Sequence, residues 1–348
     1  YDLWFFFVYY SMISVVFHSS WFDLLSKGGA GMSEYVTRSP SVTWRYQFTV
    51  LTPTYNRAHT LHRVYESLCE QTYQDFEWVV VDDGSTDDTQ ALIAAWKEEA
   101  VFPIHYIWQS NQHKKVAFNR GVAEAQGELI VALDSDDRLE SNALYDMARS
   151  WHDIPESERS QYVAVIGLCK TPTGQIVGDM YPYDLLDANP LDLQFKFNVR
   201  GEKFGCLSTQ VLRQFPFPED IPGFVPESLV WREIARAGYK TRFVNQVYRV
   251  YYDGGDSLSA QGQQNAAQHA LGLWLLAHDT VVASVAWFHY RPREFFKAAA
   301  RYTRFGLHMR RQAIGRPKGY ALHGLLSRLL VYSMSPVGAL LYLRDRMT

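Results

Sequence analysis

The acidic stretch at residues 129–137, LIVALDSDD, constrains the fold of this chain more than any other feature. An apolar run typical of a buried strand ends there on three aspartates, Asp134, Asp136 and Asp137. Side chains two positions apart in extended backbone point the same way, so Asp134 and Asp136 are expected to face one site. Two carboxylates about 4 Å apart repel by roughly 4 kcal/mol at an effective dielectric near 20, and an oxygen-binding divalent cation removes that repulsion. Taken alone, the stretch also fits a solvated turn with helix-capping aspartates.

A second apolar run, in the segment EWVVVDDGSTDDT, ends in the same way earlier in the chain. Its pattern predicts a strand at residues 77–81 that is followed by Asp82 and Asp83. A Gly-Ser-Thr turn comes next, and we expect a helix capped by Ser85 or Thr86. The following aspartates, residues 87 and 88, would lie in the first turn of that helix, where acids suit the helix dipole.

A third strand is predicted at residues 48–51, and it runs into the turn of TPTYNR. Helical patterns separate the three strands; in LHRVYESL, apolar residues recur at the spacing of one helix face. Alternating strands and helices indicate a parallel sheet with right-handed crossovers. Ligands of such open sheets bind beyond the carboxyl ends of the strands, so the three polar clusters are expected to meet in one crevice.

Four segments of this chain together resemble a family 2 inverting glycosyltransferase with the GT-A fold. They are TPTYNR, VVVDDGSTDDT, HKKVAFNRGVAEAQGELIVALDSDD and FVPESLVWREIARAGYKTRFVNQVYRVYYDGGDSLS, and the similarity covers about residues 46–259. The resemblance implies a Rossmann-like α/β fold whose central sheet is mainly parallel and flanked by helices. It also implies a nucleotide-diphosphate sugar donor, with a UDP-sugar expected, and a Mn²⁺ or Mg²⁺ cofactor held by Asp136 and Asp134.

The resemblance further implies which residues bind the nucleotide-sugar. The set combines the ends of the three strands with the segment before the acidic strand: Thr52, Pro53, Tyr55, Asn56, Arg57, Asp82, Asp83, Lys114, Asn119, Asp134 and Ser135. Lys114 or Lys115, with Asn119 and Arg120, is placed to meet the donor diphosphate. An exposed start of an amphipathic helix explains the same residues equally well.

The resemblance implies that an acidic residue, usually within a Glu-Asp pair ahead of a helix, deprotonates the acceptor hydroxyl. The matching stretch is VPESLVWREIA, where Glu227 is present but Ser228 stands at the usual Asp position. We therefore expect Glu227 to be the general base, with Glu233 as the weaker candidate. The alternative is that Glu227 only complements the helix dipole. QxxRW, the signature of processive synthases in this family, is absent from the sequence, so a single-addition, hexosyltransferase-type enzyme is expected.

Three aromatic residues and one loop receive weaker interpretations. Trp231 is expected to lie in the core or to stack on the acceptor sugar, and Tyr251 and Tyr252 are expected to pack. In YYDGGDSLS, a Gly-rich loop with Asp253, Asp256 and Ser257 could close over the donor.

The two ends of the chain differ from the middle. Residues 3–22 contain no Asp, Glu, Lys or Arg, and as a helix they would span about 30 Å, the thickness of a bilayer core. We expect residues 1–31 to be either a membrane anchor or an added, non-native segment and linker, and residues 32–258 to be the GT-A domain. Cations follow the apolar run and none precedes it, which would keep the domain on the cytoplasmic side of the membrane.

The carboxyl-terminal region, residues 259–348, is predicted to be helical and basic. Residues 280–348 carry twelve Lys or Arg against Glu294 and Asp345, a balance of +10 in a chain whose net charge is −3. Aromatic residues and leucines lie between these cations, in runs interrupted by Pro292, Pro317 and Pro336. Such helices suit an anionic membrane surface, and packing of the helices on the core is the alternative. Nucleic acid is not an expected partner because no nucleic-acid-binding module accompanies the basic helices.

Composition fits an enzyme at the cytoplasmic face of the inner membrane, held peripherally or by one anchor. Three widely spaced cysteines, Cys69, Cys169 and Cys206, predict neither a disulfide framework nor a zinc site. The basic helices favour a lipid-linked, polyprenyl-diphosphate glycan as acceptor, as in surface polysaccharide assembly. Two other function classes stay open, a nucleotidyltransferase and a non-catalytic membrane scaffold with a relic sugar-nucleotide fold.

Overall fold

A computed structural model describes residues 43–252 and 268–347, and the described residues from Trp44 onward belong to one compact unit. The apolar segment at residues 3–22 and the expected boundaries at residues 31 and 258 lie outside the described residues. So do Asp253, Asp256 and Ser257 of the Gly-rich loop.

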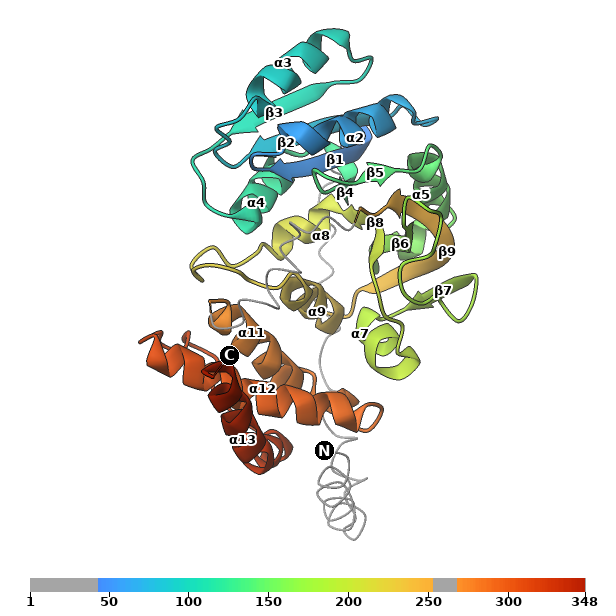
Figure 1. The fold of residues 1–348 in the computed structure, drawn as a ribbon. Helices are drawn as coiled ribbons and strands as arrows, with labels where there is room; N and C mark the ends of the chain where they lie inside the picture. Colours follow the sequence, from blue (N-terminus) through green and yellow to red (C-terminus); the bar gives the residue numbers. More distant parts are fainter. Residues whose placement is uncertain (1–42, 253–267, 348) are drawn as a thin grey trace. The chain divides into compact units, whose positions relative to one another are not determined.

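One nine-stranded sheet organises this unit (Figure 1). Its first half is parallel, with the order β3 (Ile104–Trp108), β2 (Phe76–Asp82), β1 (Tyr46–Thr54) and β4 (Gly127–Ala132). Its second half continues with β8 (Lys203–Ser208), β6 (Tyr162–Lys170), β9 (Lys240–Val250) and β5 (Arg138–Leu139), and β7 (Leu185–Ala188) pairs with β9. The three predicted strands are therefore adjacent and parallel, in the order β2-β1-β4.

The second half of the sheet is mixed, whereas the sequence predicted a mainly parallel sheet. Strand β8 is antiparallel to both of its neighbours, β4 and β6, and β9 is antiparallel to β5 and β7. Only β6 and β9 are parallel to each other in this half. Antiparallel neighbours do not need a helical crossover, and the alternating strand and helix pattern used for the prediction covers only the first half of the chain.

Helices cover both faces of the sheet. Their bounds are α2 (Ala58–Cys69), α3 (Thr89–Glu99), α4 (Lys114–Glu124), α5 (Ala143–His152), α6 (Glu156–Arg159), α7 (Pro190–Asp192), the π-helix η1 (Leu193–Phe197), α8 (Thr209–Gln214) and α9 (Ser228–Arg236). The predicted start of α3 was wrong: the helix begins at Thr89, and neither Ser85 nor Thr86 caps it. Both residues instead bond to Asn56 across the end of the sheet.

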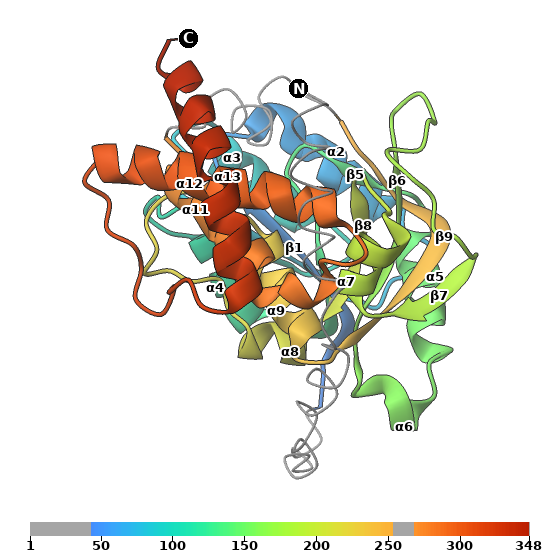
Figure 2. The ribbon, with the colours of Figure 1, turned by 90° about the horizontal axis from the view of Figure 1, so that it is seen from below.

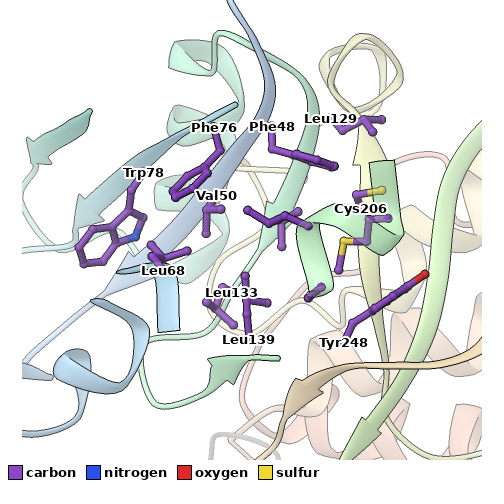
Figure 3. Close-up of a cluster of buried hydrophobic side chains, with 14 of the residues drawn as sticks. Phe48, Val50, Leu68, Phe76, Trp78, Leu129, Leu133, Leu139, Cys206 and Tyr248 are labelled. Atoms are coloured by element: carbon purple, nitrogen blue, oxygen red, sulfur yellow. The ribbon is translucent and has the colours of Figure 1, made fainter. Parts of the chain in front are cut away.

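The alternation of side chains along the buried strands divides the core between the two faces. Phe48 and Val50 of β1 belong to one cluster with residues of α2, α3 and α5, and Figure 3 shows this cluster around Trp78 and Leu133. Leu51, one position further along β1, belongs to the other cluster with residues of α4 and α9. Because neighbouring side chains point to opposite faces, both faces of the central strands are apolar.

The C-terminal region is helical, as predicted. It comprises α11 (Ala270–His278), the π-helix η2 (Asp279–Ala283), the 3-10 helix η3 (Val285–Trp287), α12 (Pro292–Arg311) and α13 (Leu325–Asp345). Pro292 begins α12 and Pro317 lies between α12 and α13, but Pro336 lies inside α13 and does not end it. Among the described helices, α13 has the length and composition to cross a membrane, and 28% of its most apolar window is buried in the protein.

A buried charge cluster joins α9 to this C-terminal region. Asp279 of η2 forms ion pairs with Arg232 (3.1 Å) and Arg236 (2.7 Å) of α9. Arg232 also donates to Thr280 and Gln194. Burial lowers the pKa of Arg232, although Asp279 opposes that effect. The cluster therefore fixes α9, the helix that begins directly after Glu227, against η2.

Replacing Asp279 by alanine is expected to destabilise the protein by about 3–5 kcal/mol, because it leaves the buried Arg232 guanidinium without its counter-charge. The measurement is the free energy of unfolding from urea denaturation. As a matched control, Glu294→Ala removes the carboxylate of an exposed ion pair with Lys297, and we expect a loss below about 1 kcal/mol. Equal losses in the two variants would contradict this account of the cluster.

Candidate active site

The carboxyl ends of β1 and β2 are tied together by Asn56. This residue adopts a left-handed backbone conformation (φ 52°), which asparagine tolerates better than most residues. Its backbone N–H donates to Ser85 Oγ (2.8 Å), and its Oδ1 accepts from the Thr86 N–H (2.8 Å). Gly84 also has a positive φ of 87°, and a Cβ there would lie 2.9 Å from the Asn111 backbone nitrogen. The turn after β2 therefore needs glycine.

The acidic loop after β4 has two kinds of aspartate. Asp134 and Asp136 are partly exposed, whereas Ser135 and Asp137 between and after them are buried. The extended backbone predicted for the stretch does not continue past β4, because Ser135 and Asp136 form a turn in which the Asp137 N–H donates to the Asp134 carbonyl (3.2 Å). Helix α2 supports the loop, because Thr60 donates to the Ser135 carbonyl (3.0 Å) and Arg63 donates to the Asp136 carbonyl (3.0 Å).

Lys114, the first residue of α4, links the acidic loop to the predicted base. Its ammonium lies 2.7 Å from Asp134 Oδ1 and 3.1 Å from Glu227 Oε1. Burial opposes the charge, but Asp134 and Glu227 raise the pKa of Lys114 above its usual value, so the ammonium form persists. Glu227 directly precedes α9, as predicted, and its side chain is 52% exposed. Two of the predicted functional carboxylates therefore lie on either side of one cation in an accessible place.

Arg249 of β9 lies beneath the acidic loop, and sequence reasoning missed it. Its guanidinium is 3.2 Å from Asp137 and 3.9 Å from Asp134, and it also reaches Glu202 (3.2 Å). Burial raises the pKa of Asp137 to about 7, although Arg249 opposes that rise. In Asp134 burial is outweighed, and Lys114 and Arg249 hold its pKa below the usual value. Strand β9 also contains Arg242, so its sequence does not single out Arg249 as the cation that meets the acidic loop.

The residues after β9 also contribute to this region. The backbone N–H of Tyr252 donates to Asp137 Oδ1 (2.9 Å), and the Arg63 guanidinium lies 4.2 Å from the Tyr252 ring centroid. Arg249 lies over the Tyr251 ring in the same way, at 5.3 Å. The two tyrosines were predicted to pack, and they pack against the two arginines that contact the acidic loop.

Several residues predicted to bind the nucleotide-sugar are buried or bonded to other parts of the fold. Thr52 and Pro53 are buried in β1, and Thr52 accepts a bond from Trp78 Nε1 (3.0 Å). Asn119 holds the Phe217 backbone through both of its amide atoms (2.9 Å each), and the neighbouring Lys115 donates to the Ile221 carbonyl. Asn119 and Lys115 therefore anchor the segment that leads to Glu227.

The two acids after β2 are buried and hydrogen-bonded. Asp82 accepts from the Ser85 N–H (2.8 Å) and from the Tyr106 hydroxyl (2.6 Å). Asp83 Oδ1 accepts from the Gln109 side chain and the Gln112 N–H (2.8 Å each). Tyr55, which is 49% exposed, and Arg57 follow β1 at the same edge of the sheet.

Trp231 and Glu233 lie on α9, the helix that follows Glu227. Trp231 packs edge-on against Phe118 and Phe217, which fits its predicted core position. Glu233 is exposed, and its position six residues after Glu227 puts it on a different side of the helix.

The residues predicted to hold a divalent cation are Asp134 and Asp136. Among the described residues no group of three or more His, Cys, Asp or Glu could hold a metal ion. Within the same residues the Asp136 carboxylate makes no hydrogen bond or ion pair, whereas that of Asp134 is shared with Lys114. Two carboxylates fit an ion such as Mg²⁺ that takes its remaining oxygen ligands from water and a substrate diphosphate.

Comparison with known proteins identifies the domain that carries the strand ends. The sequence profile of Glycosyl transferase family 2 matches residues 49–163, which run from β1 through the acidic loop to β6. The chain contains a glycosyltransferase family 2 domain. The matched region carries the three strand ends and Lys114, while Glu227 and Arg249 lie beyond it.

Two curated relatives extend the similarity. An uncharacterized glycosyltransferase of Nostoc sp. is 33% identical over 143 residues. The match covers 41% of this chain and 38% of the Nostoc protein, which is less than two thirds of that protein. A Campylobacter jejuni GalNAc(5)-diNAcBac-PP-undecaprenol β-1,3-glucosyltransferase is 26% identical over 238 residues, covering 66% of this chain and 73% of the relative.

Solved structures support the GT-A fold of this glycosyltransferase. S. aureus TarS 1–349 in complex with UDP-GlcNAc aligns with a TM-score of 0.52 at 17% identity, over 86% of this chain and 92% of TarS. The mannosyltransferase PcManGT from Pyrobaculum calidifontis, in complex with GDP-Man and Mn²⁺, aligns with a TM-score of 0.51 at 18% identity, over 87% and 88% of the two chains. These alignments reach beyond the profile match into the second half of the sheet.

Proposed function

We propose that this enzyme is a metal-dependent inverting glycosyltransferase that transfers a sugar from a UDP-sugar to a hydroxyl of a lipid-linked, polyprenyl-diphosphate glycan in surface polysaccharide assembly. The contact of Lys114 with both Asp134 and Glu227 carries the proposal. It means that a carboxylate suited to the donor and a carboxylate suited to the acceptor face the same small volume. A donor and an acceptor could react there without a large movement of the fold.

The proposed roles follow from the positions of the side chains. Asn56, Tyr55 and Arg57 at the end of β1, with Asp83 at the end of β2, would bind the nucleoside. Glu227 would accept the proton of the acceptor hydroxyl as that oxygen attacks the anomeric carbon in line with the leaving diphosphate. Lys114 would orient Glu227 and place a positive charge near the diphosphate. A Mn²⁺ or Mg²⁺ ion on Asp136 and Asp134 would supply Lewis-acid stabilisation of the leaving nucleotide diphosphate.

The choice of donor and acceptor rests on the relatives and on charge. The TarS complex contains UDP-GlcNAc, which supports a UDP-sugar donor. The name of the Campylobacter relative specifies a polyprenyl-diphosphate acceptor. The basic C-terminal helices suit an enzyme that works at the cytoplasmic face of the membrane, where anionic lipids attract cations.

Nucleotide release from a panel of sugar nucleotides, measured with and without Mn²⁺, tests this proposal. We expect release from at least one UDP-sugar, dependent on the metal and stimulated by a lipid-linked acceptor. Consumption of nucleoside triphosphate instead would identify a nucleotidyltransferase. No turnover with any donor would favour the non-catalytic scaffold.

A further inference from the structure

One side of α13 exposes a continuous row of apolar side chains. Successive members are three or four residues apart, except for an eight-residue step from Tyr332 to Leu340 that exposed Pro336 divides in half. This spacing places them on one face of a helix. Each is between 45% and 81% exposed: Leu325, Leu329, Tyr332, Leu340, Leu343 and, just past the helix end, Met347. We call this row the α13 stripe. Apolar patches of this length are rare on monomeric soluble proteins unless they have a function.

The opposite side of α13 is already used for packing. Leu330, Val331 and Met334 are buried, and Figure 2 shows α13 crossing α12. At the crossing, a Cβ on Gly338 would lie 2.5 Å from the Ala300 carbonyl oxygen. The two helices therefore approach closely, and the α13 stripe faces away from α12.

The end of α13 is held to α12 by charge. Asp345 accepts two hydrogen bonds from Arg304 (2.5 and 2.6 Å) and lies 3.0 Å from His308. It is the only acid in residues 325–347. Since the carboxylate is neutralised by its partners, the exposed charges beside the α13 stripe include the cations Arg328 and Arg346. The stripe is thus apolar with a basic border.

We infer that the α13 stripe docks on an anionic lipid surface, with α13 lying in the plane of the membrane. Leucine, tyrosine and methionine side chains bordered by arginines match the apolar and anionic layers at the edge of a bilayer. A helix that crossed the membrane would have to leave α12 and separate Asp345 from Arg304. A second copy of the chain fits less well, because antiparallel pairing of two stripes would bring Arg328 of each copy toward Arg346 of the other.

This inference rests on the proposed function for its purpose, since a lipid-linked acceptor must be met at a membrane. The inference gives α12 a packing role and α13 a lipid-docking role. The aromatic residues of α12, such as Phe295 and Tyr302, are buried within the protein, so of these two helices it is α13 that exposes large apolar side chains. Figure 1 shows α13 beside α12, away from the crevice strands.

Hydroxyl-radical footprinting of the full chain tests the docking surface locally, because it reports the oxidation of each side chain separately, even if other parts of the chain also bind lipid. With vesicles of phosphatidylcholine and phosphatidylglycerol, oxidation of Tyr332 and Met347 is expected to fall at least about threefold. Met180, exposed on the sheet part of the protein, should oxidise equally with and without lipid. Phosphatidylcholine vesicles alone should protect less, and added salt should weaken the protection.

Point variants test the stripe without opening the core, whereas deleting α12 and α13 would uncover Trp274 of α11, whose ring packs against Tyr302. Leu329→Ser combined with Leu340→Ser should abolish the lipid protection of Tyr332 and Met347. Val101→Ser, at an apolar residue 86% exposed between α3 and β3, should leave that protection unchanged.

Two results would overturn the inference. One is equal oxidation of Tyr332 and Met347 with and without anionic vesicles, and the other is protection that rises with protein concentration in the absence of lipid, which would indicate a second copy. Nucleotide release is measured in the same samples. Loss of release with lipid protection intact would count against the proposed function and leave the docking surface standing.

Discussion

Replacing Asp136 by alanine is expected to reduce sugar transfer by at least about 10³-fold, because the ion it would hold stabilises the leaving diphosphate by several kcal/mol and each 1.36 kcal/mol is tenfold in rate. The side chain makes no hydrogen bond or ion pair among the described residues, and its charge raises the pKa of the neighbouring Asp137. The fold should therefore be no less stable. The measurements are turnover of a UDP-sugar across a Mn²⁺ titration, and UDP binding by calorimetry with and without the metal.

The control for Asp136 is Asp88→Ala, which removes an exposed aspartate from the loop after β2. It should leave both turnover and the metal dependence of UDP binding unchanged. Near wild-type activity of Asp136→Ala, with the same response to Mn²⁺, would refute the assignment of Asp136 as a metal ligand.

Glu227→Gln is expected to lower transfer to the acceptor by at least about 10²-fold, the lower range for the loss of a general base. Glutamine keeps the shape of the side chain but cannot take the hydroxyl proton. Lys114 keeps its contact with Asp134, 2.7 Å away, so the donor side of the crevice should hold its charge. Transfer is measured in single-turnover experiments and donor affinity by calorimetry, and we expect the affinity to change little.

Glu233→Gln serves as the matched control for Glu227, because it makes the same substitution on α9 at an exposed position on another side of the helix. Its transfer rate should stay within about twofold of the original. If Glu227→Gln weakened donor binding as much as transfer, its role would be structural. A larger loss in Glu233→Gln would move the base to that residue.

Local sequence patterns were sufficient to predict those features that a single strand or helix determines. The strand ends after β1, β2 and β4 were predicted because apolar runs stop there on polar residues. The extended backbone predicted through Asp134, Ser135 and Asp136 was wrong, because a bond from the Asp137 N–H to the Asp134 carbonyl closes a turn there. The start of α3 was missed because Ser85 and Thr86, good capping residues by type, bond to Asn56 from another strand. At this position a contact across the sheet overrides the capping propensity of the two residues.

The sequence by itself determined the parallel half of the sheet, the meeting of three polar strand ends at one edge of it, and the position of Glu227 directly before a helix. These features depend on side-chain periods and residue types within short segments. Only the tertiary structure shows which residues of one segment face the carboxylates and which hold the backbone. Lys114 faces the carboxylates while Asn119 holds the Phe217 backbone, because α4 presents one side to the crevice and another to the segment that leads to Glu227.

Only the tertiary structure could place Arg249 beneath the acidic loop and distinguish α12 from α13. Arg249 meets Asp137 across a separation of more than a hundred residues in sequence, and no local pattern records such a pairing. Both C-terminal helices combine cations with apolar side chains, so their sequences predict the same surface. Packing buries the aromatic residues of α12 and leaves the α13 stripe exposed, because a helix can bury only the sides for which the fold supplies a neighbour.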